Sequence, residues 1–190
     1  MAETNKARIE EAAIALFADK GVGGASVAEI AEHAGVSQGL LYRHWKDKDE
    51  MALDLFAHRY FALRDRLRAV LAGQSTTRGR IAAMIREGCR IQDEDPAGFR
   101  FLLTSQHQHV GRLPGGGPSF VDVVREVIAD GIARGDIGLS DTATATAVVL
   151  GIFLQAAVFD LHGDLGRSLA ETADILAEAC WRAIAGRDAA

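Results

Sequence analysis

The fold is decided by the stretch Ser26–Lys48, which reads SVAEIAEHAGVSQGLLYRHWKDK. Ser26 and Glu29 have the spacing of a capping box, in which each side chain accepts a hydrogen bond from the other residue's backbone N–H at the start of a helix. Gly35 is expected to end this helix, because glycine adopts the left-handed conformation that a tight turn requires. Ser37 is the expected cap of a second short helix. The stretch therefore predicts two short helices joined by a sharp turn.

The same turn has the residue types of a helix-turn-helix. Ala31 is small enough for the second helix to pack closely on the first, and Gly35 follows it at the spacing that the motif needs. Val36 and Leu41 are placed to fill the angle between the two helices. An amphipathic helix precedes the pair, since helical spacing puts on one stripe the apolar residues Ile9, Ala12, Ala13, Leu16 and Phe17. These features together predict a three-helix head rather than a helical hairpin inside a larger bundle.

Positive charge in this head is local rather than general. Residues 1–50 carry six basic and nine acidic side chains, and the whole chain has a formal net charge of −5. Between Val36 and Lys48, by contrast, the only acidic side chain is one aspartate beside three basic ones. A protein that holds nucleic acid through a uniformly basic surface is therefore excluded. Any hold on DNA must come from a few placed phosphate contacts.

The second short helix is the candidate DNA-reading element. Its first turn, Ser37–Leu40, is where a recognition helix brings side chains to base edges in the major groove. Gln38 can pair with adenine through two hydrogen bonds, and Leu40 can contact a thymine methyl group. The residues after this turn are expected to face the phosphates, as is Lys48 at the start of the next helix. The candidate DNA-binding residues are Ser26, Val36, Ser37, Gln38, Gly39, Leu40, Tyr42, Arg43, His44 and Lys48.

Several of these residues have a structural alternative that the sequence leaves open. Tyr42 could lie in the core with its hydroxyl group at the surface, and His44 could be an ordinary packed histidine. Arg43 and Lys46 could be solvated charges without a partner. Trp45 is expected in the core rather than at the DNA, because its large ring is more useful for packing there.

The rest of the chain predicts an all-α body. Apolar residues recur at helical spacing without the alternation of strands, so we expect about nine helices in all. The character of the sequence changes near residue 50, where the tight three-helix unit gives way to long helices. We therefore predict a helix-turn-helix DNA-binding domain at residues 1–50 and a separate helical body at residues 51–190. The expected caps of the later helices are Asp47 with Glu50, Asp95 before Pro96, Ser140, and Ser168 with Glu171.

Composition limits the environment of the protein. Residues 142–159 carry no charge over 18 residues, which is the lower limit for a helix that spans a bilayer. Three threonines, Gly151 and Gln155 interrupt the segment, so we expect a helix buried on most sides by protein. Cys89 and Cys180 lie far apart and without metal-ligand spacing, which predicts free buried thiols. We therefore expect a soluble, cytoplasmic chain with no membrane partner, no metal and no cofactor.

On these motifs, residues 8–55 resemble the head of the TetR family of transcriptional regulators. The matching features are the first-helix pattern from Ile9 to Phe17, Gly21, the segment from Ser26 to Ser37, and Leu41-Tyr42-Arg43-His44-Trp45 with Lys48. The resemblance implies a homodimeric repressor that a small molecule releases and whose two heads occupy successive major-groove segments of a palindromic operator. It also implies DNA contacts at Ser26, Ser37, Gln38, Leu40, Tyr42, His44 and Lys48. Gln38, Leu40 and Trp45 depart from the residues common in the family, so the operator sequence stays open.

For the body at residues 51–190, the resemblance implies a ligand-binding and dimerisation domain. Its helices would enclose a ligand pocket, and its two last helices would pair with their copies. Polar side chains are few in this part, so we expect a largely apolar or aromatic effector. The candidate ligand-binding residues are Met84, Cys89, Phe99, Phe101, Phe120, Val124, Gln155 and Phe159. The candidate dimer-interface residues are Ala145, Val149, Ile152, Ala156, Ile175 and Ala179. Packing within the core of a single chain is the alternative for each of these residues.

Two further patterns and two further function classes need weighing. His107 and His109 suggest a metal or acid site, but alternate residues on a helix point in different directions, so a solvated helix end is expected. The loop Gly115–Gly117 lacks the strand and the Lys-Ser/Thr of a phosphate-binding loop. No Ser/His/Asp set, metal-ligand spacing or carboxylate pair is evident in the sequence, so we expect no enzyme. An interaction protein that uses DNA as a platform for another protein partner is the alternative function, and the acidic head favours it.

Overall fold

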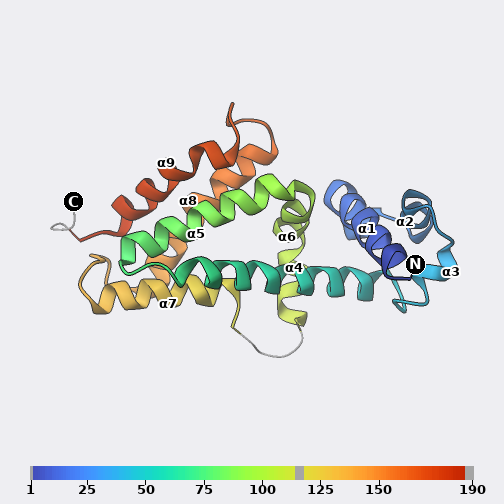
Figure 1. The fold of residues 1–190 in the computed structure, drawn as a ribbon, viewed down its shortest axis with the longest axis horizontal. Coiled ribbons are helices and arrows are strands. Elements are labelled where there is room, and N and C mark those ends of the chain that lie inside the picture. Colours follow the sequence, from blue (N-terminus) through green and yellow to red (C-terminus); the bar gives the residue numbers. More distant parts are fainter. Residues whose placement is uncertain (1, 114–117, 187–190) are drawn as a thin grey trace. The chain divides into compact units, whose positions relative to one another are not determined.

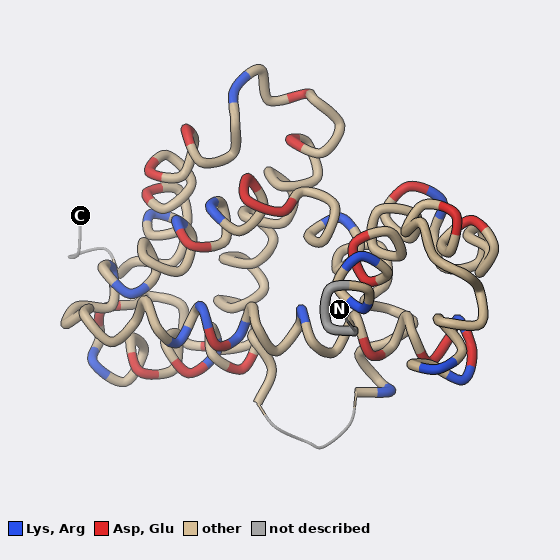
Figure 2. Tube along the Cα trace, turned by 45° about the vertical axis from the view of Figure 1, so that its right-hand side comes forward, with Lys and Arg blue, Asp and Glu red and all other residues tan. Residues whose placement is uncertain are grey.

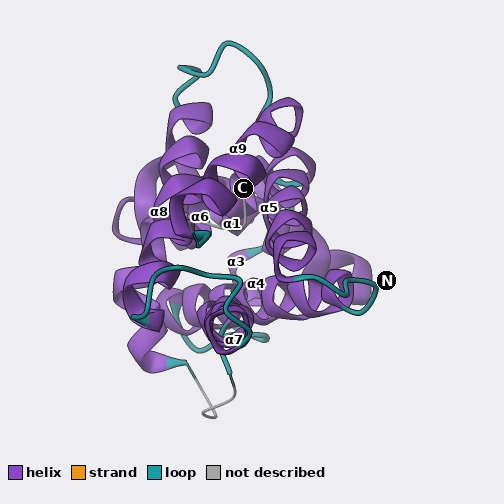
Figure 3. Ribbon diagram, turned by 90° about the vertical axis from the view of Figure 1, so that its left-hand side faces the viewer, coloured by secondary structure: helices purple, strands orange, loops and turns teal. Residues whose placement is uncertain are grey.

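The structure is a computed structural model that describes residues 2–113 and 118–186. Within these residues every regular element is a helix, as Figure 3 shows, so the predicted all-α fold is confirmed. Nine α-helices and one short 3-10 helix, η1, follow one another along this part of the chain (Figure 1). Their bounds are α1 Ala2–Gly24, α2 Val27–Ala34, α3 Gln38–Leu41, α4 Lys48–Leu71, α5 Thr77–Glu94, α6 Pro96–His109, η1 Val110–Arg112, α7 Phe120–Ala133, α8 Thr142–Leu161 and α9 Leu169–Ile184.

The chain divides into two compact units. Unit 1 consists of Met1–Tyr60 together with Asp95–Gly116, and unit 2 consists of Phe61–Glu94 together with Gly117–Ala190. Helix α4 contributes its first half to unit 1 and its second half to unit 2. Unit 1 therefore holds more than the predicted head, because it also contains α6 and η1. The boundary of the DNA-binding domain at residue 50 stays a prediction.

In unit 1, α1 packs against both α2 and α6. Gly21 interrupts α1 near its end with a φ of 70°. Aromatic rings fill the centre of the unit. The ring centre of Phe101 on α6 lies 5.6 Å from that of Phe17 and 6.2 Å from that of Phe56, and all three side chains are fully buried. Helix α6 is thus part of the core of the head, although it lies far from the head in sequence.

In unit 2, α5 packs against α7 and α9, and α8 packs against the same two helices. The core is largely aliphatic and draws on all four helices, as its buried residues Ile81, Ile85, Val124, Ile128, Val149, Leu169 and Ile184 show. The backbone of Ile137 forms an isolated bridge with Ala185, and Gly138 N donates to Ile184 O at 2.9 Å. These bonds fasten the α7–α8 connection to the end of α9.

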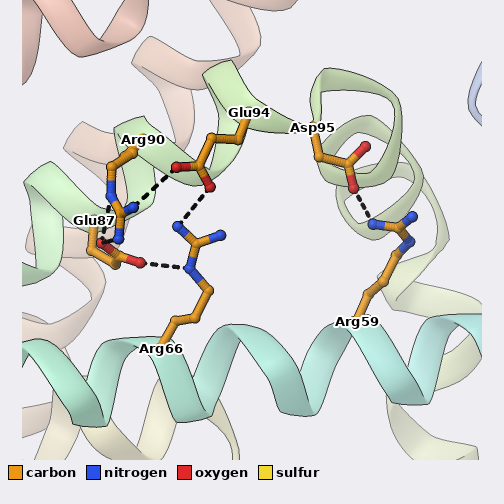
Figure 4. Close-up of polar contacts among 6 residues, drawn as sticks. All are labelled: Arg59, Arg66, Glu87, Arg90, Glu94 and Asp95. Carbon is orange, nitrogen blue, oxygen red and sulfur yellow. Dashed lines mark hydrogen bonds and ion pairs between the residues drawn. The ribbon is translucent and has the colours of Figure 1, made fainter.

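Ion pairs join α4 to α5 within unit 2, as Figure 4 shows. Glu87 is buried, and its carboxylate lies 2.6 Å from a guanidinium nitrogen of Arg66 and of Arg90. Glu94 pairs with the same two arginines at 2.9 and 3.0 Å. Because Glu87 has lost its water while its partners stay partly exposed, the pairs orient the two helices more than they add net stability.

Hydrogen bonds confirm most of the predicted helix starts. Ser26–Glu29 and Ser168–Glu171 are both reciprocal capping boxes. Asp95 caps α6 through the Gly98 N–H, directly before the proline that begins the helix. The same carboxylate pairs with Arg59 of α4, within unit 1 (Figure 4). Asp95 therefore both caps the first turn of α6 and holds that turn against α4.

Helix α8 differs from its prediction in two ways. Its N-cap is Asp141, whose carboxylate accepts the Thr144 N–H at 2.7 Å, so the predicted cap Ser140 is wrong. Only 28% of its apolar window is buried, so the expected burial on most sides is also wrong. By length and composition it is the one helix among the described residues that could cross a membrane, a test that core helices of soluble proteins also pass.

Candidate functional site

The helix-turn-helix has the structure that its spacing predicted. Ser26 Oγ accepts the Glu29 N–H at 3.2 Å, and the Glu29 carboxylate accepts the Ser26 N–H at 2.8 Å. A hydrogen bond from Lys20 of α1, together with those from Ser26, lowers the pKa of Glu29 to about 2. Gly35 ends α2 with a φ of 62°, a conformation that residues with side chains rarely adopt. Leu41 is buried in the angle between the helices, as predicted.

Helix α3 offers an exposed surface. Ser37 precedes the helix without using its side chain as a cap, so its hydroxyl group is available to a partner. Gln38 and Gly39 are exposed, and a Cβ on Gly39 would meet no atom within 4 Å. Tyr42 is 56% exposed, which excludes the alternative that it lies in the core. An unhindered first turn with polar side chains is what entry into a DNA groove requires.

The residues after α3 are divided between surface and core. Arg43 and His44 are exposed, whereas Trp45 is buried and donates its Nε1–H to Asp54 at 2.9 Å, as expected of a core tryptophan. Lys48 is half-buried, and its ammonium group donates to the carbonyl oxygen of Ala25 at 2.6 Å. It therefore ties the start of α4 to the α1–α2 connection, a role that the sequence did not indicate. Its contact with DNA stays a prediction.

Unit 1 also has a groove of about 510 Å³ between several of its elements. Its basic lining residues are Lys6 of α1, Arg43 after α3 and Arg112 of η1. The carboxylates of Glu50 and Asp54 on α4 line it as well. Sequence reasoning missed this groove because Arg112 joins the other residues only through the packing of α6 in unit 1.

His109, at the end of α6, is buried rather than solvated as expected, whereas His107 is exposed. The ring of His109 lies 5.3 Å from that of Phe56, and neither ring nitrogen has a hydrogen-bond partner among the described residues. Burial lowers the pKa of His109, the charge of Arg112 adds to this effect, and Asp49 opposes it. The imidazole is therefore neutral at pH 7.

The stability of unit 1 should depend on pH through His109. Because its pKa in the folded state lies below the ordinary value of 6.5, the folded state binds fewer protons than the unfolded state once the pH falls below that value. Stability is therefore complete above pH 6.5 and is lost as the pH falls towards the lowered pKa. His109→Leu should remove this loss, and also the cost of about 1–3 kcal/mol of burying an unpaired polar ring.

Denaturant unfolding at about pH 8 and about pH 5 measures this dependence. His107→Leu is the matched control, since His107 is exposed on the same helix and should leave the pH dependence of the wild type unchanged. An identical loss of stability on acidification in His109→Leu and in the wild type would contradict the assignment.

The candidate ligand-binding residues are spread over both units. Phe99 and Phe101 belong to unit 1, where Phe101 is part of the aromatic core, and the other six belong to unit 2. Among those six, the buried ones are Met84, Cys89 and Val124, the half-buried one is Phe120, and the exposed ones are Gln155 and Phe159. Their contact with a ligand stays a prediction. For Phe101, core packing is the role that the structure gives it.

The candidate interface residues are only partly on the surface. Ala145 and Val149 are buried inside unit 2, so they are core residues and not part of a surface that is free to pair. Ile152 and Ala156 are half-buried, whereas Ile175 is 61% exposed and Ala179 is exposed. The exposed side of α8 follows a different stripe at helical spacing, made of Ala147, Gly151, Gln155 and Phe159.

The two cysteines are free and buried, as the sequence predicted. Burial raises the pKa of Cys89 and of Cys180 to about 12, so both thiols are protonated at neutral pH. Among the described residues, no group of three His, Cys, Asp or Glu side chains could hold a metal ion. The loop Gly115–Gly117 lies outside the described residues.

The helix-turn-helix segment has counterparts among known proteins. Residues 9–55 match the model of the bacterial regulatory proteins of the tetR family. An HTH-type transcriptional regulator of Staphylococcus aureus (strain USA300) is 38% identical over 71 residues, which cover 34% of this chain and 38% of the relative. The chain thus matches well under half the length of this curated relative, and the match concerns the head.

Solved structures extend the likeness to the whole fold. A TetR family transcription regulator from Marinobacter aquaeolei VT8 has a TM-score of 0.77 at 21% identity, with 97% of both chains covered. FadR from Bacillus subtilis, solved in complex with stearoyl-CoA, has a TM-score of 0.74 at 18% identity, with 92% of this chain and 97% of that chain covered. At such identities the likeness concerns the fold alone. The helix-turn-helix segment therefore resembles that of the tetR family of bacterial regulatory proteins, and the fold of the described residues is one that a solved regulator of that family shares.

Proposed function

We propose that the chain is a DNA-binding transcriptional regulator, a repressor that a small, largely apolar ligand releases from a palindromic operator. The observation that carries this proposal is the exposed first turn of α3. There the Ser37 hydroxyl group is not used as a cap, Gln38 is exposed and Tyr42 is 56% exposed. Polar side chains on the first turn of a helix read base edges in the major groove, and neighbouring ones hold the phosphates.

The proposal includes a homodimer. A palindromic operator presents two half-sites about 34 Å apart, so two heads are needed to occupy it. Most of the apolar window of α8 is unburied, and Ile175 of α9 is 61% exposed. Contiguous exposed apolar surface is typical of subunit interfaces. We therefore assign pairing to the exposed sides of α8 and α9.

Release by a ligand is assigned to the apolar body. FadR from Bacillus subtilis, which shares the fold, was solved with stearoyl-CoA. Helix α8 carries no charge over residues 142–159, which suits contact with a ligand that has an extended hydrocarbon chain. Acyl-CoA thioesters are therefore the first effector class to add to a DNA-binding assay, where they should weaken the complex.

The DNA-binding proposal is tested by fluorescence anisotropy with duplexes taken from upstream of the protein's own gene. The wild type should bind an inverted repeat there more tightly than a scrambled duplex of the same composition. Gln38→Ala removes a base contact worth about 1–3 kcal/mol, which weakens binding to the repeat roughly fivefold or more. Ser75→Ala is the control, because Ser75 is also a neutral, exposed polar residue but lies in the α4–α5 connection of unit 2. Equal binding of both duplexes by the wild type and by Gln38→Ala would contradict the proposal.

The acidic balance of the head supports a second candidate function. Residues 1–50 carry nine acidic against six basic side chains, which weakens any general attraction to DNA. Under this alternative the protein keeps the fold but uses DNA only as a platform for another protein. A partner captured through residues of unit 2, together with no effect of any ligand on DNA affinity, would favour it over the repressor.

A further inference from the structure

We propose that Arg112 of η1 contacts the phosphate backbone of bound DNA, although it lies far outside the helix-turn-helix. This inference rests on the proposed function and deepens it. Arg112 shares the groove of about 510 Å³ with Arg43, which follows α3 directly, and with Lys6 of α1. All of these residues belong to unit 1. The groove thus extends the candidate DNA-binding surface to the end of α6.

The carboxylates that line the groove are already engaged by other donors. Asp54 Oδ2 accepts the Nε1–H of Trp45 at 2.9 Å. Glu50 Oε2 accepts the backbone N–H of Lys46 at 2.6 Å. Glu50 and Asp54 both belong to α4. Their hydrogen bonds to Lys46 and Trp45 fix the turn between α3 and α4. The acidic side chains of the groove therefore have a structural role that does not involve its arginines.

The two arginines of the groove, in contrast, form no ion pair with a carboxylate of the described residues. Neither Arg43 nor Arg112 forms an ion pair within the part of the chain that the structure describes, and both are exposed. Lys6 differs from them, since it pairs with Glu10 at 3.3 Å and its ammonium group lies 5.7 Å from the centre of the Trp45 ring. Two unpaired guanidinium groups on one concave surface form a ready site for an anion.

The place of the groove in the head indicates which anion this is. Arg43 follows α3, which the proposed function places in the major groove, so an anion that reaches Arg43 is a phosphate of the strand beside that groove. A guanidinium group offers two parallel N–H donors that match a phosphate. Elsewhere in unit 1 acidic and basic residues are intermixed, as Figure 2 shows, and residues 1–50 carry more acidic than basic side chains, so a general attraction for DNA is not expected. Placed contacts of this kind are what an acidic head needs.

The salt dependence of DNA binding tests the inference. Each phosphate contact that is lost lowers the slope of log Kobs against log salt concentration by about 0.9. Arg112→Gln should lower the slope by this amount, so the advantage of the wild type should shrink about 3.5-fold between about 50 and 200 mM salt. The preference for the inverted repeat over the scrambled duplex should stay unchanged, because a phosphate contact carries no sequence information.

Two further variants distinguish the effect of the positive charge at residue 112 from the effect of the net charge of the protein. Arg167→Gln removes the same charge from an exposed position in the α8–α9 connection of unit 2 and should keep the slope of the wild type. Arg112→Lys keeps the charge and should keep most of the slope, since a lysine still binds a phosphate as a point charge. The thermal unfolding of Arg112→Gln should match that of the wild type, because the described residues give Arg112 no ion pair to lose.

The possible outcomes are distinct. If the wild type binds the inverted repeat and Arg112→Gln has the same slope as Arg167→Gln, the phosphate contact is overturned while the proposed function stands. If the wild type binds neither duplex, the proposed function itself fails. If Arg112→Gln loses affinity for inorganic pyrophosphate, measured by calorimetry, but keeps its slope with DNA, the groove binds small anions and the DNA contact is overturned.

Discussion

Replacing Gly88 with alanine is expected to destabilise unit 2 by up to about 2 kcal/mol, although alanine is the better helix former. A Cβ on Gly88 would lie 2.6 and 2.9 Å from two carbon atoms of the Phe153 ring. Both residues are buried, on α5 and α8, so the ring has no free space beside it. Overpacking of this kind costs about 1–3 kcal/mol, which is offset only in part by a gain of about 1 kcal/mol in helix propensity when the contact is as short as this one. Urea unfolding followed by circular dichroism measures the change.

Phe153→Leu tests whether the clash with the Phe153 ring is what destabilises Gly88→Ala. Leucine is shorter than phenylalanine, so it leaves room for the new Cβ while costing some packing energy of its own. The double variant should therefore be more stable than the sum of the two single changes predicts, by about 1 kcal/mol or more. Strict additivity of the two changes would show that contact with the Phe153 ring is not what destabilises Gly88→Ala.

Features that depend on residues close in sequence could be predicted. The capping boxes Ser26–Glu29 and Ser168–Glu171 need only two residues three positions apart. The sequence pattern alone therefore predicts their hydrogen bonds. The left-handed turn at Gly35 is local in the same way. The wrong cap at Ser140 has a local cause as well, because Asp141 next to it accepts the same kind of hydrogen bond. Because Ser140 and Asp141 are adjacent and cap helices about equally well, the sequence does not show which of them is the N-cap.

Features that depend on packing between distant segments could not be predicted. His107 and His109 stand in the same short polar run, but only His109 is buried, where its ring lies beside that of Phe56 of α4. Ala145 and Val149 have the small size that suits a subunit interface, but α8 is apolar on nearly all sides. Its sequence therefore does not say which side faces the core. Arg112 joins the groove of the head for a similar reason, since no pattern links it to α3.

Changing Ile175 to glutamate is expected to turn the proposed homodimer into a monomer. Ile175 is 61% exposed on α9, and Phe159 is 47% exposed on α8, which leaves large apolar side chains in water unless a second copy covers them. A carboxylate in such an interface would lose its water without gaining a partner. The loss of a central contact weakens association by about 2 kcal/mol or more, roughly thirtyfold. Light scattering over a range of protein concentrations measures the mass.

Val110→Glu is the matched control for the charge. Val110 is 43% exposed, but it lies on η1 in unit 1, so its variant should keep the mass of the wild type. DNA binding then distinguishes pairing from misfolding, because a folded monomer keeps its affinity for a single half-site while it loses the tighter binding to the whole palindrome. If Ile175→Glu keeps the mass of the wild type, the copies pair through another surface. In that case the assignment of the exposed sides of α8 and α9 to pairing fails.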